Sequence, residues 1–319
     1  MFLIKFIKNW TLPVAMCFGA IAYVIFTYIA ILRPVKSLTL DFIDILTPAL
    51  IFLMLFFTFC KVDLHQLRPR MWHMWLLLLQ IGICGSLVGS ILYFQPSLPY
   101  KIFWEAMLAC VLAPTATAAA VVTGKLGGNS ATLTSYTLIS NVFAAFMITS
   151  FCPLVELQTD ISFWGAFSKI LSQVTRLLIL PFLVAWFIRR YFPKFHSLCL
   201  KPKNIAFYLW GISLAIVTAQ TIRFVVNNSS HPGLEWAIAL GCLFMCCIQF
   251  FIGKVLGGHY GQRISGGQAF GQKNTIFAIW MAYTYLNPLS AIGPGSYVMW
   301  QNIINSWQLW KKRKKDEVR

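Results

Sequence analysis

The sequence predicts an all-α integral membrane protein with ten transmembrane helices, arranged as two inverted five-helix repeats. Three observations lead to this prediction. The chain of 319 residues is 58% hydrophobic, has a mean hydropathy of +0.70 and is only 11% charged, whereas a soluble protein carries about 25% charged residues. Its hydrophobic residues form long blocks that basic segments separate. Two of these blocks are interrupted, at corresponding positions of the two halves.

Ten hydrophobic blocks are each long enough to span a membrane, which takes about 20 largely apolar residues. The predicted spans run near 12–32, 43–61, 72–93, 102–124, 130–152, 163–188, 204–225, 234–256, 268–286 and 293–311. The net charge of +17 lies mostly in the connections between spans, which indicates membrane topology and not binding to nucleic acid.

The distribution of basic residues predicts the orientation of the chain. With a cytoplasmic N-terminus, most of the 26 Lys and Arg residues fall on the cytoplasmic side, including the run 311–315 after the last span. The outer segments hold only Arg33, Lys36, Lys101, Lys169 and Arg223. This alternation predicts an even number of spans, with both termini in the cytoplasm.

Two spans contain interruptions. In the fourth, Pro114 breaks the apolar run, and the polar Thr115 and Thr117 after it suit the start of a new helix. The ninth opens with the glycine-rich and polar segment 266–274. These are the fourth spans of two five-span halves, and because five is odd the halves have opposite orientations. Such a matched pair indicates a transporter binding site; a proline kink and a glycine packing motif are the alternative.

Two cations lie inside predicted spans. Lys273 sits near the start of the ninth and Arg176 inside the sixth, and no acidic residue lies in the middle of any span. A charge at membrane depth is costly and usually functional, so the pair predicts a pathway for a negatively charged substrate. For Arg176, pairing with backbone carbonyls or snorkelling to the membrane surface remain alternatives. Glu105, near the start of the fourth span, is expected at the membrane interface.

Enzyme chemistry is not predicted. The sequence has no His-Glu-x-x-His motif for a metalloprotease, and its five histidines fall in loops or at span edges. The nine cysteines lack zinc-ligand spacing, and their odd number argues against a disulfide framework.

The order and spacing of several motifs resemble the bile acid:sodium symporter family along essentially the whole chain. The matching segments are residues 52–58 followed by 63–68, residues 114–123, Leu180-Pro181 ahead of Arg189-Arg190, Gly271-Gln272-Lys273-Asn274, and residues 300–306. The resemblance implies transport of amphipathic or small organic anions, such as bile acids, sulfated steroids and small carboxylates, together with sodium. It implies no other cofactor.

The resemblance also implies a division of the chain. The first repeat would be residues 1–160, with a panel domain in 1–70 and a core domain in 71–160. The second would be residues 161–319, with panel 161–230, core 231–311 and a basic cytoplasmic tail, 312–319. Broken helices four and nine would cross at the membrane midplane. A bacterial inner membrane is the expected location, by analogy.

Several sodium-ligand positions of the family are changed here. The resemblance places a Ser-Asn pair of helix four at Ala119 and Ala120, a glutamate of helix nine at Ala269 and a serine of helix five at Leu133. Thr137 and Gln80 match retained positions, but two side chains are too few for a sodium ion. A glutamine position corresponds to Lys273, with Gln272 beside it. An ammonium about 4 Å from sodium would repel it by about 4 kcal/mol at an effective dielectric constant of 20.

These changes predict an organic-anion transporter without sodium coupling. Lys273 would replace the bound cation by donating to freed carbonyls of helices four and nine, and it would either cycle its proton or stay charged. Thr115, Thr117 and Asn274 would face the substrate at the helix crossing, where half-helix N-termini favour anions, and Arg176 would pair with a substrate carboxylate or sulfate.

Two other functions remain open. One is an ordinary sodium-coupled bile acid symporter, and the other is a membrane sensor of the same fold that binds a ligand without transport. The expected partners are a small organic anion and membrane lipid, and a monomer is compatible with the sequence.

Overall fold

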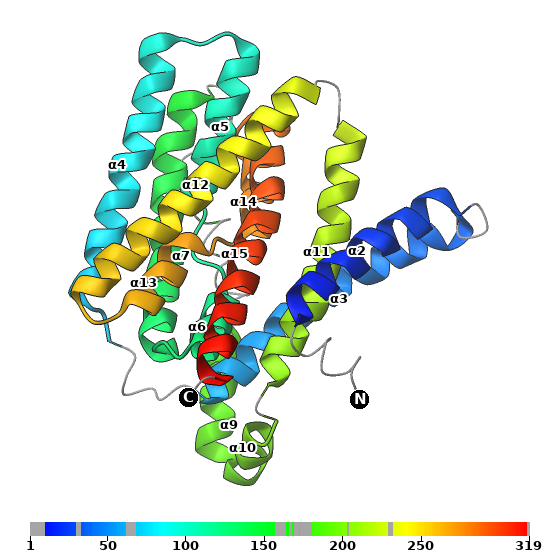
Figure 1. Ribbon diagram of the computed structural model, residues 1–319, viewed down its shortest axis with the longest axis vertical. Helices are drawn as coiled ribbons and strands as arrows, with labels where there is room; N and C mark the ends of the chain where they lie inside the picture. The colour runs from blue at the N-terminus through cyan, green and yellow to red at the C-terminus, as the bar shows by residue number, and fades with distance from the viewer. Residues whose placement is uncertain are drawn as a thin grey trace. The chain divides into compact units, whose positions relative to one another are not determined.

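A computed structural model of the chain describes residues 10–29, 33–61, 68–156, 164–165, 168, 172, 180–202, 204–228 and 232–317. These residues are almost entirely helical (Figure 1). Within them no β-strand forms, and a single antiparallel bridge joins Thr115 to Lys273.

Five described helices have the length and apolar composition to cross a membrane. They are α2 (Thr11–Tyr28), α4 (Met71–Phe94), α7 (Ser130–Val155), α11 (Ile205–Asn228) and α12 (Pro232–His259). The remaining described helices are α3 (Arg33–Lys61), α5 (Leu98–Leu112), α6 (Ala119–Leu126), α9 (Leu180–Tyr191), α10 (Pro193–Leu200), α13 (Arg263–Gly271), α14 (Thr275–Tyr285) and α15 (Ile292–Glu317), with the 3₁₀ turn η4 (Pro288–Ala291) before α15. The all-helical membrane class is therefore confirmed, and the count of ten spans stays a prediction.

Both predicted interruptions are present. Helix α5 ends at Leu112, just before the Ala113-Pro114 pair, because the residue before a proline is disfavoured in the helical region. A new helix, α6, begins at Ala119. The ninth predicted span is divided between α13 and α14, and the Asn274 side chain caps α14 by accepting a hydrogen bond from the Phe277 N–H. Helix α13 begins at Arg263, earlier than the sequence pattern suggested.

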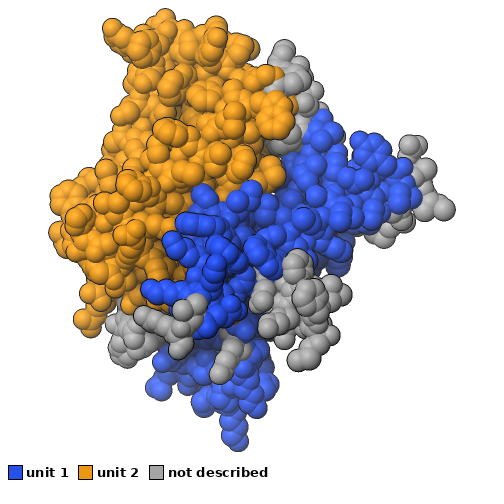
Figure 2. Space-filling view, viewed as in Figure 1, with its two compact units in different colours: residues 1–62, 176–226, 302–319 blue, residues 63–175, 227–301 orange. Residues whose placement is uncertain are grey.

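The chain divides into two compact units (Figure 2). Unit 1 consists of residues 1–62, 176–226 and 302–319, and unit 2 of residues 63–175 and 227–301. Helix α15 contributes its first part, up to Gln301, to unit 2 and the rest to unit 1. The predicted boundaries between repeats and between panel and core stay a prediction.

Unit 1 contains α2, α3, α9, α10, α11 and the end of α15. Helix α3 packs against α9, where the rings of Phe59 and Phe182 meet edge to face with their centroids 5.4 Å apart. Beside this contact, Lys61 donates to the carbonyl of Pro202 at 2.8 Å, and a His196 ring nitrogen lies 3.0 Å from the carbonyl oxygen of Cys60.

Unit 2 contains the two interrupted spans. Helix α4 packs against α5 and α7, and α12 packs against α5 and, most extensively, α13 (Figure 1). The last contact is close because it is made by glycines. A Cβ on Gly266 would overlap the carbonyl oxygen of Gly253 and lie 2.8 Å from the Cα of Gly257. The backbones of α12 and α13 therefore touch directly, which places the end of α13 and the residues after it.

Candidate functional site

The two helix interruptions meet inside unit 2. The Ala116 N–H donates to the carbonyl of Gln272, and the Asn274 N–H donates to the carbonyl of Pro114, both at 2.8 Å. These bonds join the extended segment between α5 and α6 to the one between α13 and α14, with Thr115 opposite Lys273. The extended backbone thus finds partners within the protein, as it must at membrane depth.

The Lys273 ammonium lies at the end of α5. Its Nζ donates to the carbonyl oxygens of Val111 at 3.2 Å and Ala113 at 3.1 Å, and the side chain is only 2% exposed. The last carbonyls of a helix have no partner within that helix, so the ammonium stabilises the negative end of the α5 dipole. The Phe270 ring, 5.0 Å from Nζ, adds a cation–π contact. The sequence predicted that Lys273 would bind carbonyls of both interrupted spans, but Val111 and Ala113 both belong to the fourth predicted span.

Other side chains take up the freed backbone groups of the ninth span. The Gln301 side chain on α15 accepts from the Lys273 N–H at 2.8 Å and donates to the Lys273 carbonyl at 3.2 Å. The Tyr297 hydroxyl, one turn earlier, donates to the carbonyl of Gly271 at 2.8 Å. Because Tyr297 occupies this carbonyl at the end of α13, the ammonium is not needed there. Helix α15 therefore positions the segment that carries Lys273.

Gln301 and Tyr297 were not among the residues singled out from the sequence. Gln301 lies in a motif that resembles the family, and an amide among apolar residues in the last span was a signal that could have been used. Tyr297 gave no signal, because a tyrosine in a membrane helix is ordinarily read as part of an interfacial aromatic belt; here its hydroxyl is buried.

The predicted sodium-ligand positions lie together but form an apolar cluster. Ala119, Ala120, Leu133 and Ala269 all pack into one buried hydrophobic cluster. The other members of this cluster are Trp72, Leu76, Leu77, Tyr136 and Phe270. A sodium ion needs oxygen ligands, and the alanine and leucine side chains at the four predicted positions supply none. The donor set at these four positions therefore does not fit sodium, and aromatic and aliphatic carbon fills the space around them.

The two retained polar side chains bind backbone groups. Gln80 donates from Nε2 to the carbonyl of Val111 at 2.7 Å, the same oxygen that Lys273 contacts. The Thr137 hydroxyl donates to the carbonyl of Leu133, one turn back in α7, at 2.9 Å. Among the described residues, no group of three His, Cys, Asp or Glu side chains is arranged to hold a metal ion.

The predicted substrate residues gather at the crossing, with one exception. Thr115 and Thr117 are buried, Asn274 is half-buried, and all three lie in or beside the interrupted segments. The Thr115 hydroxyl donates to the carbonyl of Ala269 at 2.6 Å, which fixes it to α13. Gln272 is buried, and its Oε1 has no hydrogen-bond partner among the described residues. Arg176 lies outside the residues that the structure describes.

Glu105, which was expected from the sequence at the membrane interface, is buried within the protein. Its side chain is 0% exposed, and its carboxylate accepts from the Asn287 N–H at 2.9 Å. Lys101 lies 3.6 Å from Glu105 and 2.7 Å from Glu156, so it pairs with both carboxylates. The helical spacing of Lys101 and Glu105 allowed this pair, but the backbone partner at residue 287 comes from a distant segment that sequence alone could not place.

An apolar, all-helical chain in which two interrupted helices cross has the architecture of an integral membrane transporter. A comparison with protein-family models identifies the family: that of the sodium bile acid symporters matches residues 47–228. The chain therefore belongs to the sodium bile acid symporter family, and the resemblance noted in its motifs is confirmed. A search of curated proteins gives no match.

The matched region includes α5, α6 and α7, and with them the carbonyls of Val111 and Ala113 and the apolar positions Ala119 and Ala120. Lys273 and Gln301 lie beyond its end. Membership of a transporter family and the apolar helices identify the chain as an integral membrane protein.

Proposed function

We propose that this protein is a secondary transporter of organic anions that works by alternating access without sodium, with the Lys273 ammonium in the role of a bound cation. One observation carries the proposal: Nζ of Lys273 donates to two freed carbonyls of α5, whereas Ala119, Ala120 and Ala269 lie in an apolar cluster. A fixed positive charge thus stabilises the interrupted helix, and the side-chain oxygens that would bind sodium are missing.

The anionic class of the substrate follows from the charges at the crossing. Helices α6 and α14 both begin there, so their positive ends lie near Thr117 and Asn274. The buried ammonium adds a full positive charge in the same region. An anion would be attracted there, whereas a cation would be repelled. We assign substrate contacts to Thr117, Asn274 and Arg176, and a structural contribution to Thr115, whose hydroxyl already binds Ala269.

Two units of the described chain support an alternating-access mechanism. Unit 2 holds both interrupted spans and the Lys273 site, and the described helices of unit 1 contain no such breaks. We assign unit 2 the role of the core that carries the site and unit 1 that of the panel. Movement of one bundle relative to another around a fixed site is the usual mechanism of inverted-repeat transporters.

Uptake into proteoliposomes tests the proposal. Labelled steroid sulfate, bile acid and small carboxylate would each be supplied with sodium, with potassium only, and with an imposed pH gradient. We expect saturable uptake of at least one anion in potassium. A response to the pH gradient would assign Lys273 a cycling proton, and its absence would assign uniport or exchange. Uptake only in sodium would establish an ordinary symporter, and saturable binding without flux would establish a sensor; either result would overturn the proposal.

A further inference from the structure

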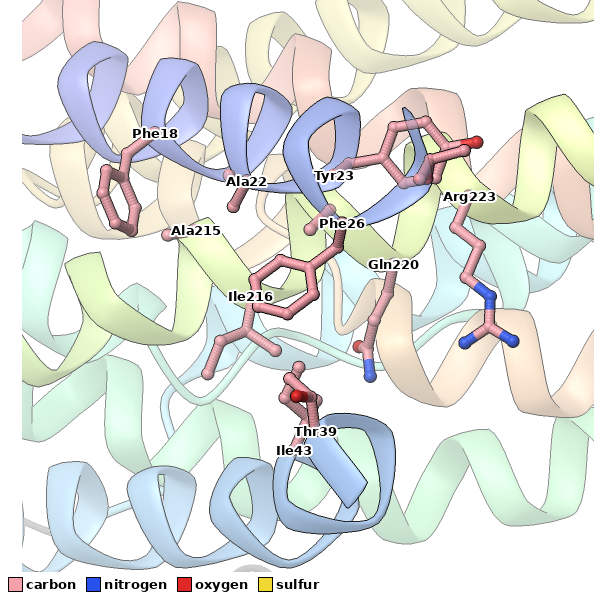
Figure 3. Close-up of a pocket in the computed structure, with 13 residues that line it drawn as sticks. Phe18, Ala22, Tyr23, Phe26, Thr39, Ile43, Ala215, Ile216, Gln220 and Arg223 are labelled. Atoms are coloured by element: carbon pink, nitrogen blue, oxygen red, sulfur yellow. The ribbon is translucent and has the colours of Figure 1, made fainter. Parts of the chain in front are cut away.

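Unit 1 contains an apolar cavity of about 150 Å³ between α2, α3 and α11 (Figure 3). Its walls are formed by Phe18, Ala22 and Phe26 of α2, Ile43 of α3, and Ala215 and Ile216 of α11. A cavity of this size can hold a small hydrocarbon group, and the side chains of these six residues offer water no hydrogen-bond partner. It shares no residue with the Lys273 site.

The cavity lies beside a close contact between α2 and α11. A Cβ on Gly19 would overlap the backbone of Ala215, so the two helices are in direct contact there. From this contact, the lining residues recur at helical spacing along both helices, as in Ala215, Ala219 and Arg223 on α11. The small side chains at positions 22 and 219 leave the space between the helices unfilled.

One end of the cavity is polar and basic. Gln220 and Arg223 follow the apolar residues on α11, and Arg223 lies about 12 Å along the helix from the Gly19 contact at 1.5 Å per residue. Thr27 and Thr39 lie at the same cavity. Figure 3 shows Gln220 and Arg223 projecting from α11 toward the side on which α3 lies. The cavity therefore combines a hydrocarbon wall with a guanidinium at its far end.

We propose that this cavity binds part of an acyl chain of an anionic phospholipid, with the lipid phosphate at Arg223. The protein is embedded in lipid, so acyl chains are the most abundant apolar groups around it. A guanidinium binds a phosphate through two parallel hydrogen bonds. In the predicted topology, Arg223 lies at the outer end of its span, where lipid headgroups reside.

Lipid binding to the purified, delipidated full-length protein tests this inference. Native mass spectrometry would compare phosphatidylglycerol with phosphatidylcholine of the same acyl chains. We expect the wild type to prefer the anionic lipid by about tenfold, the ratio that a contact of about 1.4 kcal/mol gives. Arg223→Gln should abolish most of this preference. Arg190→Gln, which removes an exposed arginine elsewhere in unit 1, should keep it.

A second variant tests the cavity itself. Ala219→Phe would fill the space between the helices and should reduce retention of both lipids at least severalfold, whereas Ala49→Phe, at an exposed position of α3, should not. An unchanged lipid preference in Arg223→Gln, or unchanged retention in a folded Ala219→Phe, would overturn the proposal. The proposal would also be overturned if, in a competition experiment, binding of a steroid sulfate depended on Arg223 and binding of phosphatidylglycerol did not. None of these results bears on sodium-independent uptake.

Discussion

At the scale of single residues, Lys273 is unusual because both hydrogen bonds of its ammonium go to backbone oxygens. In the described part of the chain, the ammonium binds the carbonyls of Val111 and Ala113 at the end of α5. The backbone N–H of Lys273 donates to the Gln301 side chain. The ammonium therefore has a structural contribution that does not depend on any substrate. This separates two properties that mutations can test independently: the stability of the crossing and the ion dependence of transport.

Lys273→Met keeps the length of the side chain but leaves the carbonyls of Val111 and Ala113 without the ammonium. Losing hydrogen bonds to buried groups costs about 1–3 kcal/mol per group. Val111 keeps the Gln80 bond, so we expect a loss of about 2–3 kcal/mol, measured as a lower midpoint of thermal unfolding in detergent. Lys125→Met, at an exposed position of α6, is the control. Equal unfolding midpoints for the two variants would contradict the assigned contacts.

Tyr297→Phe removes one hydroxyl and keeps the ring. Gly271 would lose a donor to its carbonyl, and Gln249 would lose the hydroxyl that its Nε2 contacts at 3.3 Å. We expect a destabilisation of about 1–3 kcal/mol, measured by the same unfolding experiment. Tyr100→Phe, at an exposed tyrosine of the same unit, should change stability by less than about 0.5 kcal/mol. A neutral Tyr297→Phe would show that the hydroxyl does not hold α13.

At the scale of helices, the interruptions were predictable and their partners were not. Proline and the glycine-rich segment signal broken helices through local backbone chemistry, so Pro114 and residues 266–274 could be identified from sequence. Which carbonyl binds which donor depends on long-range packing, and this is why the bonds of Gln301 and Tyr297 were missed. The burial of Glu105 was missed for the same reason, since its partner Asn287 is distant in sequence.

Gly266→Ala tests the close packing of α12 and α13. The added Cβ would meet the backbone of Gly253 and Gly257, which cannot move as a side-chain end can. Overpacking of this kind costs about 1–3 kcal/mol, so we expect a lower unfolding midpoint. Gly89→Ala on α4 is the matched control. A Cβ there meets no atom within 4 Å, so alanine should be neutral or stabilising by up to about 1 kcal/mol. The reverse order of stability would contradict the described packing.

At the scale of the whole molecule, composition predicted the membrane class and the order and spacing of motifs predicted the family, whereas the arrangement of the repeats remains a prediction. Hydropathy reports burial in lipid for each segment separately, so it identifies spans without relating them. Ala119, Leu133 and Ala269 pack in one apolar cluster, and comparison of motifs could not show this packing. The motifs revealed which side chains were absent, and only packing reveals that carbon fills their place.

The predicted orientation can be measured with reporter fusions at the C-terminus. The basic run 311–315 should hold the terminus in the cytoplasm. We therefore expect a green fluorescent protein fusion after residue 319 to be fluorescent in bacteria, and an alkaline phosphatase fusion at the same position to be inactive. Fusions after residue 228, beyond the seventh predicted span, should give the opposite result and serve as the control. An active phosphatase at the C-terminus would contradict the even number of spans.

Equilibrium binding of radioactive sodium to the purified protein tests the central claim most directly, because it asks whether Lys273 stands where family members bind a cation. The measurement would be made on the detergent-solubilised protein, with and without excess unlabelled sodium and with potassium as the competing control. We predict no saturable sodium binding, because the four apolar positions offer no side-chain oxygen and the ammonium repels a second cation. Saturable, sodium-specific binding with a stoichiometry of one or more ions per chain would contradict the account.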